Sequence, residues 1–108
     1  MSLYLHGLPA SRGIAEGTVK IISGIQDAEK FHDGDILVAK ITDPTMVFMM
    51  GKAAGIVCDI GGIMSHPSIV SREMGIPCVV NTKDATKILK DGMRVRVDGE
   101  KGTVEVLS

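Results

Sequence analysis

The middle of this chain carries an apolar run, a glycine pair and a Ser-His pair in immediate succession, and this order restricts the fold more than any other feature. Residues 55–60 are almost continuously apolar, which is typical of a strand covered on both faces. Gly61 and Gly62 then lead the chain out of that strand. Ser65 is a preferred N-cap residue, so we expect a helix over residues 66–74.

The end of this helix is equally well marked. Gly75 suits the left-handed position that follows a helix, and Pro77 prevents continuation. A further short strand is expected over residues 77–80. The apolar side chains that we expect to face the core from the helix are Ile69, Val70 and Met74.

Short apolar runs separated by many of the 13 glycines indicate several more strands and tight turns. These strands are expected over residues 3–7, 14–22 (with a bend at Gly17), 35–39, 93–97 and 103–107, the last two forming a hairpin. Residues 9–13 are expected to form a loop.

Asp43 and Pro44 form a strong helix start, because aspartate caps and proline suits the first helical position. The side chains expected on the apolar face of this helix are Met46, Met49, Met50 and Ala53. With Phe48 these methionines make the helix unusually apolar, which fits core packing or a docking face for a partner. Short helical segments are also expected over residues 27–31 and 84–90.

Composition limits the function classes. The 108 residues suggest one domain over 1–108, and 44% hydrophobic residues provide a modest core. A net charge of −1 without a basic patch argues against nucleic acid. The sequence contains neither an apolar run long enough to span a membrane nor a signal-peptide pattern, so we expect a cytoplasmic protein.

The two cysteines, Cys58 and Cys78, both lie in apolar runs, so we expect buried thiols and not a disulfide. The three histidines and two cysteines are scattered without metal-ligand spacing, and no metal site is expected. A metal or redox protein is therefore poorly supported.

His66 is the residue with the clearest chemical potential. The amino end of a helix carries free N–H groups and a partial positive charge, which attract an anion and favour a neutral imidazole. A neutral imidazole has a lone pair that can attack phosphorus. Gly61 and Gly62 would let a ligand approach the backbone. From the residues alone, however, an ordinary polar residue at a helix start is the more common case for such a histidine.

A resemblance favours the first interpretation. The segment from residue 61 to residue 80 resembles the phosphohistidine segment of the PEP-utilising enzymes, which include phosphoenolpyruvate synthase, pyruvate phosphate dikinase, Enzyme I of the sugar phosphotransferase system and rifampicin phosphotransferase. Its sequence is Gly61-Gly62-Ile63-Met64-Ser65-His66-Pro67-Ser68-Ile69-Val70-Ser71-Arg72-Glu73-Met74-Gly75-Ile76-Pro77-Cys78-Val79-Val80. Residues 7–17, 34–38, 42–44 and 91–104 resemble other motifs of the same family.

This resemblance implies an α/β fold, the swivelling β/β/α phosphohistidine domain, as a single compact domain. It implies that His66 takes up a phosphoryl group and delivers it elsewhere. ATP or phosphoenolpyruvate and Mg²⁺ would be bound by partners, which are separate ATP-grasp-like nucleotide-binding chains, PEP-binding barrel chains, or both. The sequence has no phosphate-cradling glycine loop with lysine, so the chain is not expected to turn over a substrate alone. The alternative is a non-catalytic interaction or regulatory module that retains the fold.

The residues expected to support a phosphoryl group on His66 are Gly61, Gly62, Ser65, Ser68, Thr45 and Arg72. We expect Ser65 both to cap the helix and to lie near the phosphoryl group, and Thr45 to face His66. Arg72 matches the family arginine and would pair with phosphate or with a partner carboxylate, or else be solvated. Several residues depart from the family pattern, among them Met64, which stands where threonine is usual, and Pro67, which removes one N–H donor.

Overall fold

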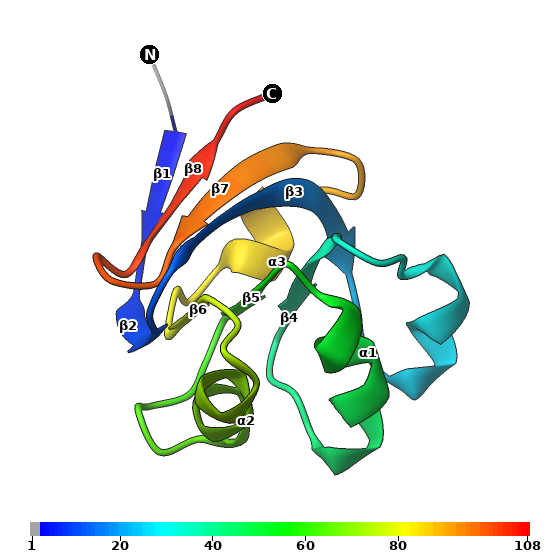
Figure 1. Ribbon diagram of the computed structural model, residues 1–108. Coiled ribbons are helices and arrows are strands. Elements are labelled where there is room, and N and C mark those ends of the chain that lie inside the picture. Colours follow the sequence, from blue (N-terminus) through cyan, green and yellow to red (C-terminus); the bar gives the residue numbers. More distant parts are fainter. Residues whose placement is uncertain (1–2) are drawn as a thin grey trace.

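The computed structural model describes residues 3–108, and within them one curled sheet has the strand order β1-β8-β7-β3-β4-β5-β6-β2 (Figure 1). The strands are β1 (Leu3–His6), β2 (Leu8–Ser11), β3 (Ile14–Ile21), β4 (Ile36–Ala39), β5 (Gly55–Cys58), β6 (Cys78–Val80), β7 (Arg94–Asp98) and β8 (Thr103–Val106). The α-helices are α1 (Val47–Lys52), α2 (His66–Met74) and α3 (Ala85–Ile88), and the 3₁₀ segments are η1 (Ile25–Lys30) and η2 (Pro44–Met46).

Strand β3 joins two halves of this sheet. Its first residues pair antiparallel with β7, and its last residues pair parallel with β4. The change of partner follows the predicted bend at Gly17, where a Cβ atom would lie 2.6 Å from the Gly34 carbonyl oxygen. We call β1, β8, β7 and the start of β3 the outer sheet, and the end of β3 with β4, β5, β6 and β2 the central sheet.

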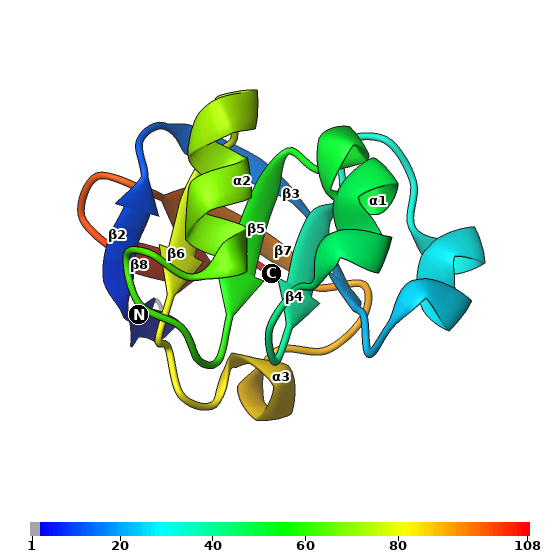
Figure 2. The same ribbon diagram turned by 90° about the horizontal axis from the view of Figure 1, so that it is seen from below.

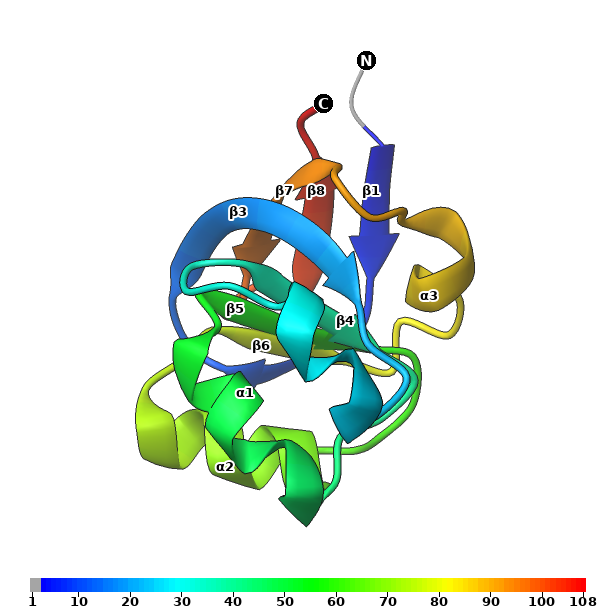
Figure 3. The same ribbon diagram turned by 90° about the vertical axis from the view of Figure 1, so that its right-hand side faces the viewer.

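The central sheet is covered on both faces, as the continuous apolar runs predict. One face packs against the outer sheet through Ile36, Val38, Val57 and Val79. The other face packs beneath the helices through Leu37, Ala39, Ile56, Cys58, Cys78 and Val80. Figure 3 shows the resulting layers of outer sheet, central sheet and helices α1 and α2. The predicted β/β/α arrangement is therefore confirmed.

The predicted loop over residues 9–13 is wrong for residues 9–11 and confirmed for Arg12 and Gly13, which are irregular. Residues 9–11 belong to β2, which pairs antiparallel with β6 and has a register shift between Pro9 and Ser11. Proline is tolerated there because β2 is the last strand of the central sheet and need not donate to a neighbour on its free side. The predicted helix 84–90 is also shorter, spanning Ala85–Ile88.

The methionine-rich helix forms largely as predicted. Met46, Met49 and Met50 are buried in the core beneath the central sheet, whereas Phe48 is 89% exposed. The first turn is the 3₁₀ segment η2, and the Asp43 side chain accepts a hydrogen bond from the Thr45 amide at its start. Cys58 and Cys78 are buried free thiols, as predicted.

The face that α2 buries differs from the prediction. Val70 is partly buried against the core, as predicted. The fully buried residues, however, are Pro67, Ser68 and Ser71, whereas Ile69 and Met74 are 38% and 40% exposed. These small side chains let the helix lie close to β2 and β6, so a face without large apolar residues makes the contact.

Candidate functional site

The site is built where parallel strands β4 and β5 end. Because the two strands are parallel, the segments that follow them leave the same edge of the central sheet. The first leads through Thr42 into η2 and α1, and the second leads through Gly61 and Gly62 into α2. Figure 2 shows α1 and α2 side by side over the central sheet. This arrangement brings Thr42 and His66 together from distant positions in the sequence.

His66 is the first residue of the nine-residue α2 and is half-buried. Its Nδ1 atom lies 2.8 Å from Thr42 Oγ1, within hydrogen-bond distance. Thr42 is only 3% exposed, so its hydroxyl is held by the surrounding structure. The imidazole is thus oriented through one nitrogen, and no hydrogen bond to Nε2 occurs among the described residues 3–108.

When Nδ1 carries the proton, it donates to Thr42 Oγ1 and leaves the Nε2 lone pair available. This tautomer has the form needed for nucleophilic attack. Thr42 was not predicted as a site residue. The available signal was its place in the Thr42-Asp43-Pro44 motif, but the contact depends on how the sheet aligns β4 with β5.

Asp43 organises the segment next to Thr42. Its carboxylate accepts hydrogen bonds from the Thr45 amide, at 2.8 Å, and from the Thr45 hydroxyl. The Thr45 hydroxyl is the main cause that lowers the pKa of Asp43, followed by the amide, and His66 contributes a small favourable charge interaction. The Thr45 side chain therefore binds Asp43, and its predicted role beside His66 stays a prediction.

Gly61 and Gly62 shape the loop before α2 in different ways. Gly61 has a φ angle of +117°, and a Cβ atom there would lie 2.8 Å from Ser65 Oγ, so only glycine fits easily. Gly62 has open space around it among the described residues, but its carbonyl oxygen accepts hydrogen bonds from Ser65 Oγ and Ser68 Oγ, both at 2.7 Å. The loop is therefore stabilised by hydrogen bonds between these two serine side chains and its own backbone.

These bonds correct the predicted cap. Ser65 occupies the N-cap position, yet its side chain makes no capping hydrogen bond. Its hydroxyl donates to Gly62 instead, and Ser65 Oγ lies 3.2 Å from Ser68 Oγ. Ser65 directly precedes His66, Ser68 follows it by two residues, and both fix the loop that carries it. Their contact with a phosphoryl group stays a prediction.

Arg72 also holds this loop. Its Nη2 donates to the Ile63 carbonyl oxygen at 2.7 Å, and its Nη1 donates to the Ala10 carbonyl oxygen at 2.8 Å. The guanidinium thereby connects the loop before α2 with β2. These two bonds give Arg72 a structural role that the sequence did not predict, and its predicted pairing with phosphate or a partner carboxylate stays a prediction.

Met64 and Pro67, two of the residues that depart from the family pattern, have different surroundings. The Met64 side chain is 78% exposed, on the loop between Gly62 and Ser65. Pro67 is buried at the second helical position and offers no N–H group. Of the first residues of α2, His66 and Ser68 retain backbone N–H groups that the first helical turn leaves free of intrahelical partners.

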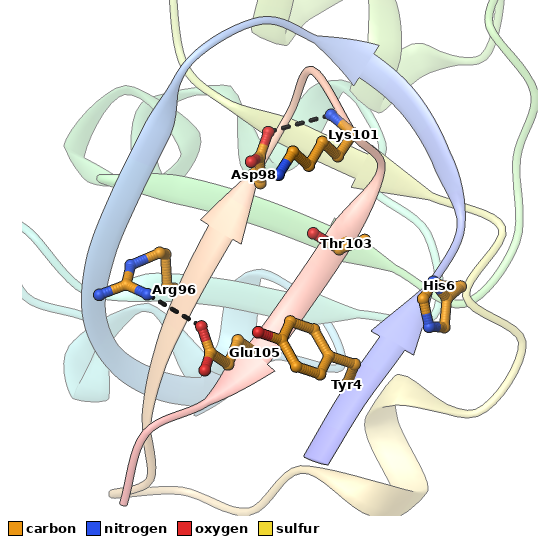
Figure 4. A pocket seen from close by; sticks show the side chains of 7 residues that line it. All are labelled: Tyr4, His6, Arg96, Asp98, Lys101, Thr103 and Glu105. Carbon is orange, nitrogen blue, oxygen red and sulfur yellow. Dashed lines mark hydrogen bonds and ion pairs between the residues drawn. The ribbon is translucent and has the colours of Figure 1, made fainter. Parts of the chain in front are cut away.

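A separate hollow of about 420 Å³ lies on the exposed face of the outer sheet (Figure 4). Its lining residues are Tyr4, His6, Arg96, Asp98, Lys101, Thr103 and Glu105. None of them belongs to the His66 site, which lies in the opposite layer of the domain. Within residues 3–108, no group of three or more His, Cys, Asp or Glu side chains is placed to hold a metal ion. No helix in that range is long and apolar enough to cross a membrane.

Comparison with known proteins links this chain to one family. Residues 31–102 match the family described as "PEP-utilising enzyme, mobile domain". The chain is 57% identical over 102 residues to a probable phosphoenolpyruvate synthase of Archaeoglobus fulgidus, a match that covers 94% of this chain and 14% of that protein. It is 45% identical over 101 residues to a rifampicin phosphotransferase of Bacillus cereus, covering 94% of this chain and 12% of that protein. The chain thus spans only a small part of these relatives.

Solved structures agree with the sequence match. The solution structure of Enzyme I aligns with a TM-score of 0.64 and 29% identity, covering 74% of this chain and 33% of that chain. Aconitase X of Thermococcus kodakaraensis aligns over 98% of this chain and 99% of that chain with a TM-score of 0.72, but at 22% identity it shows a shared fold alone. The family match over residues 31–102 and the identity to phosphoenolpyruvate synthases are decisive: this chain belongs to the PEP-utilising enzyme mobile domains.

Proposed function

We propose that this domain carries a phosphoryl group on His66 Nε2 and transfers it between partner catalytic domains. The observation that carries the proposal is the 2.8 Å contact between His66 Nδ1 and Thr42 Oγ1 at the start of α2. This contact orients a half-buried imidazole and leaves its second nitrogen without a partner among residues 3–108. The relatives named phosphoenolpyruvate synthase and rifampicin phosphotransferase support phosphoryl transfer as the chemistry.

The proposed step is a simple displacement. The Nε2 lone pair attacks the phosphorus of the donor, a P–N bond forms, and the P–O bond to the leaving group breaks with its electron pair. Nδ1–H meanwhile donates to Thr42 Oγ1. The reverse displacement at a second site passes the phosphoryl group to an acceptor oxygen and restores the neutral imidazole.

The surroundings of His66 suit both its unphosphorylated and its phosphorylated state. The amino end of α2 carries free N–H groups and partial positive charge, which favour the phosphoryl oxygens over the uncharged ring. The hydrogen bonds of Gly62 and Arg72 hold the loop that carries His66 in place. Thus the reacting nitrogen is presented by a fixed support, while the domain as a whole moves between sites.

The partners supply what this chain lacks. We propose that an ATP-grasp-like domain, a PEP-binding barrel, or both bind the phosphoryl donor and acceptor together with Mg²⁺. The chain covers only 14% and 12% of two relatives, which supports the presence of further domains in such systems. ATP and phosphoenolpyruvate are the donors that the resemblance implies.

The test is phosphoryl labelling of the chain. The protein is incubated with Mg²⁺, a competent partner domain, and ATP or phosphoenolpyruvate carrying ³²P in the transferable group. The expected label is lost in acid, retained in alkali and absent from His66→Ala. His6→Ala, altered on the outer sheet, is the matched control and should be labelled like the unaltered protein. Normal labelling of His66→Ala would contradict the proposal.

A further inference from the structure

A groove runs between β2 and α2, behind the loop that carries His66. Its volume is about 610 Å³, within the range of roughly 300–1,000 Å³ typical of small-molecule sites. Its lining residues are Pro9, Ala10, Ser11, Arg12, Ile63, Arg72 and Gly75. We call it the β2–α2 groove. It shares Ile63 and Arg72 with the support of the His66 loop but does not include His66 itself.

The charged side chains that line the groove are all positive. Arg12 and Arg72 line it, and no aspartate or glutamate belongs to its lining within the described chain. Arg12 pairs with Glu100, whose Oε1 lies 3.7 Å from Arg12 Nε, but the Arg12 side chain is 86% exposed. Such an exposed pair contributes little, so Arg12 remains available to another anion.

Arg72 also retains binding capacity. A guanidinium has five N–H donors, and Arg72 uses one each for the carbonyl oxygens of Ala10 and Ile63. Those bonds fix its position without neutralising its charge, because carbonyl groups carry no net charge. A fixed guanidinium binds an oxyanion with little loss of side-chain entropy.

The partial negative charge at the carboxyl end of α2 would repel an anion in the groove, but hydrogen bonds reduce this effect. The Ser71 and Arg72 carbonyl oxygens at this end accept hydrogen bonds from Ile76 and Gly75 at 2.9 and 3.3 Å. The partial negative charge is therefore partly compensated, whereas the two guanidinium groups carry full charges. The two arginines therefore make the electrostatic potential in the groove positive.

The free side of β2 is not open to an added strand. Pro9 has no N–H group, and Arg72 already occupies the Ala10 carbonyl oxygen. An extended peptide therefore lacks the backbone contacts that strand addition needs. Pro9 and the half-exposed Ile63 instead offer apolar walls to a compact ligand.

We propose that the β2–α2 groove binds a small organic anion, with its phosphate or carboxylate between Arg12 and Arg72 and its apolar body against Pro9 and Ile63. This site is separate from the phosphoryl-accepting histidine and does not depend on the proposed function. Both charge and apolar contact contribute, so a ligand that combines them binds more tightly than one with either alone.

The test is a titration of the full chain followed by ¹⁵N–¹H correlation NMR. The probes are phenyl phosphate and benzoate, with inorganic phosphate as the anion alone and benzyl alcohol as the ring alone. Phenyl phosphate should give saturable shifts at the Arg12, Ile63 and Gly75 amides. Its affinity should exceed that of inorganic phosphate and of benzyl alcohol at least tenfold, and benzoate distinguishes carboxylate from phosphate recognition.

Three variants make the result decisive. Arg12→Gln should weaken phenyl phosphate binding about two- to fivefold, as expected for a lost exposed charged contact of roughly 0.4–1 kcal/mol. Arg94→Gln, an arginine of the outer sheet, and His66→Ala should leave it unchanged. Linear shifts without saturation, unchanged binding to Arg12→Gln, or shifts centred on His66 and Ser68 would overturn the proposal. The last outcome would assign the anion to the amino end of α2.

Discussion

At the scale of single residues, the site depends on a contact between two side chains from different strand ends. In the proposed transfer Thr42 is a positioning residue, because it hydrogen-bonds the His66 imidazole at Nδ1 and not at the attacking Nε2. Thr42→Val keeps the shape but removes the hydroxyl. We expect a two- to tenfold slower transfer to His66, because a lost hydrogen bond of this kind costs about 0.5–1.5 kcal/mol.

The readouts for Thr42→Val are the initial rate of labelling and the tautomer of His66 from imidazole ¹⁵N shifts. The variant should increase the fraction of His66 protonated at Nε2, whereas Thr42→Ser should retain the Nδ1–H form and the rate. An unchanged tautomer with a slower rate would argue against positioning through this hydrogen bond.

The two buried thiols give a second prediction at this scale. Burial is the main cause that raises the pKa of Cys78 to about 11, and it raises the pKa of Cys58 as well. Few thiolates exist in the folded protein at pH 8, so a disulfide reagent should react far more slowly than with the chain in guanidinium chloride.

The free energy of unfolding should fall above about pH 9, because the thiols of the unfolded chain ionise at lower pH than the buried ones. Rapid reaction of the folded protein with the disulfide reagent would contradict the raised pKa of the two thiols and the loss of stability that follows from it.

At the scale of elements, the sequence predicts those whose buried face is made of large apolar residues. The α1 helix is predicted correctly because Met46, Met49 and Met50 repeat at helical spacing and all reach the core. The α2 helix is placed correctly, but its buried face is not, because close approach to β2 and β6 selects the small Ser68 and Ser71.

Contacts between residues far apart in the chain are also the part of the candidate site that the sequence does not predict. His66, Gly61 and Gly62 are recognisable because they lie in one contiguous motif. The Thr42 contact and the Arg72 bond to Ala10 join residues far apart in the chain, and both depend on strand order. Strand β2 was missed for the same reason, since it is defined by pairing with β6 and not by its own composition.

Ser71 tests this close approach of α2. Its Oγ is buried without an oxygen or nitrogen partner within residues 3–108, beside the Cys78 thiol, whose pKa it lowers slightly against the larger effect of burial. Ser71→Ala should leave the free energy of unfolding unchanged or raise it, because it removes a poorly paired hydroxyl. Ser71→Leu should lower it by about 1–3 kcal/mol through overpacking. Urea denaturation measures both, and a cost above 1 kcal/mol for Ser71→Ala would show that the hydroxyl has a stabilising partner.

At the scale of the whole molecule, the outer sheet, central sheet and helices form one domain because β3 belongs to both sheets. The helices depend on the central sheet for their position, and the central sheet packs its other face on the outer sheet. A disturbance at the bend of β3 therefore acts on both sheets together. The geometry of His66 follows from the alignment of β4 and β5, so it too depends on this bend.

Gly17→Ala tests that dependence, and Gly51→Ala is its matched control. An added Cβ at Gly17 would lie 2.6 Å from the Gly34 carbonyl oxygen and 3.1 Å from Ile36 Cγ1, whereas at Gly51, in α1, it meets no atom of the described chain within 4 Å. Gly17→Ala should lower the free energy of unfolding by about 1–3 kcal/mol, because β3 or β4 must shift. Gly51→Ala should raise it by about 0.5–1 kcal/mol, because alanine favours the helix. Urea denaturation followed by circular dichroism measures both changes in one cooperative transition. Equal effects of the two substitutions, or separate transitions for the two sheets in Gly17→Ala, would contradict the view that β3 couples them.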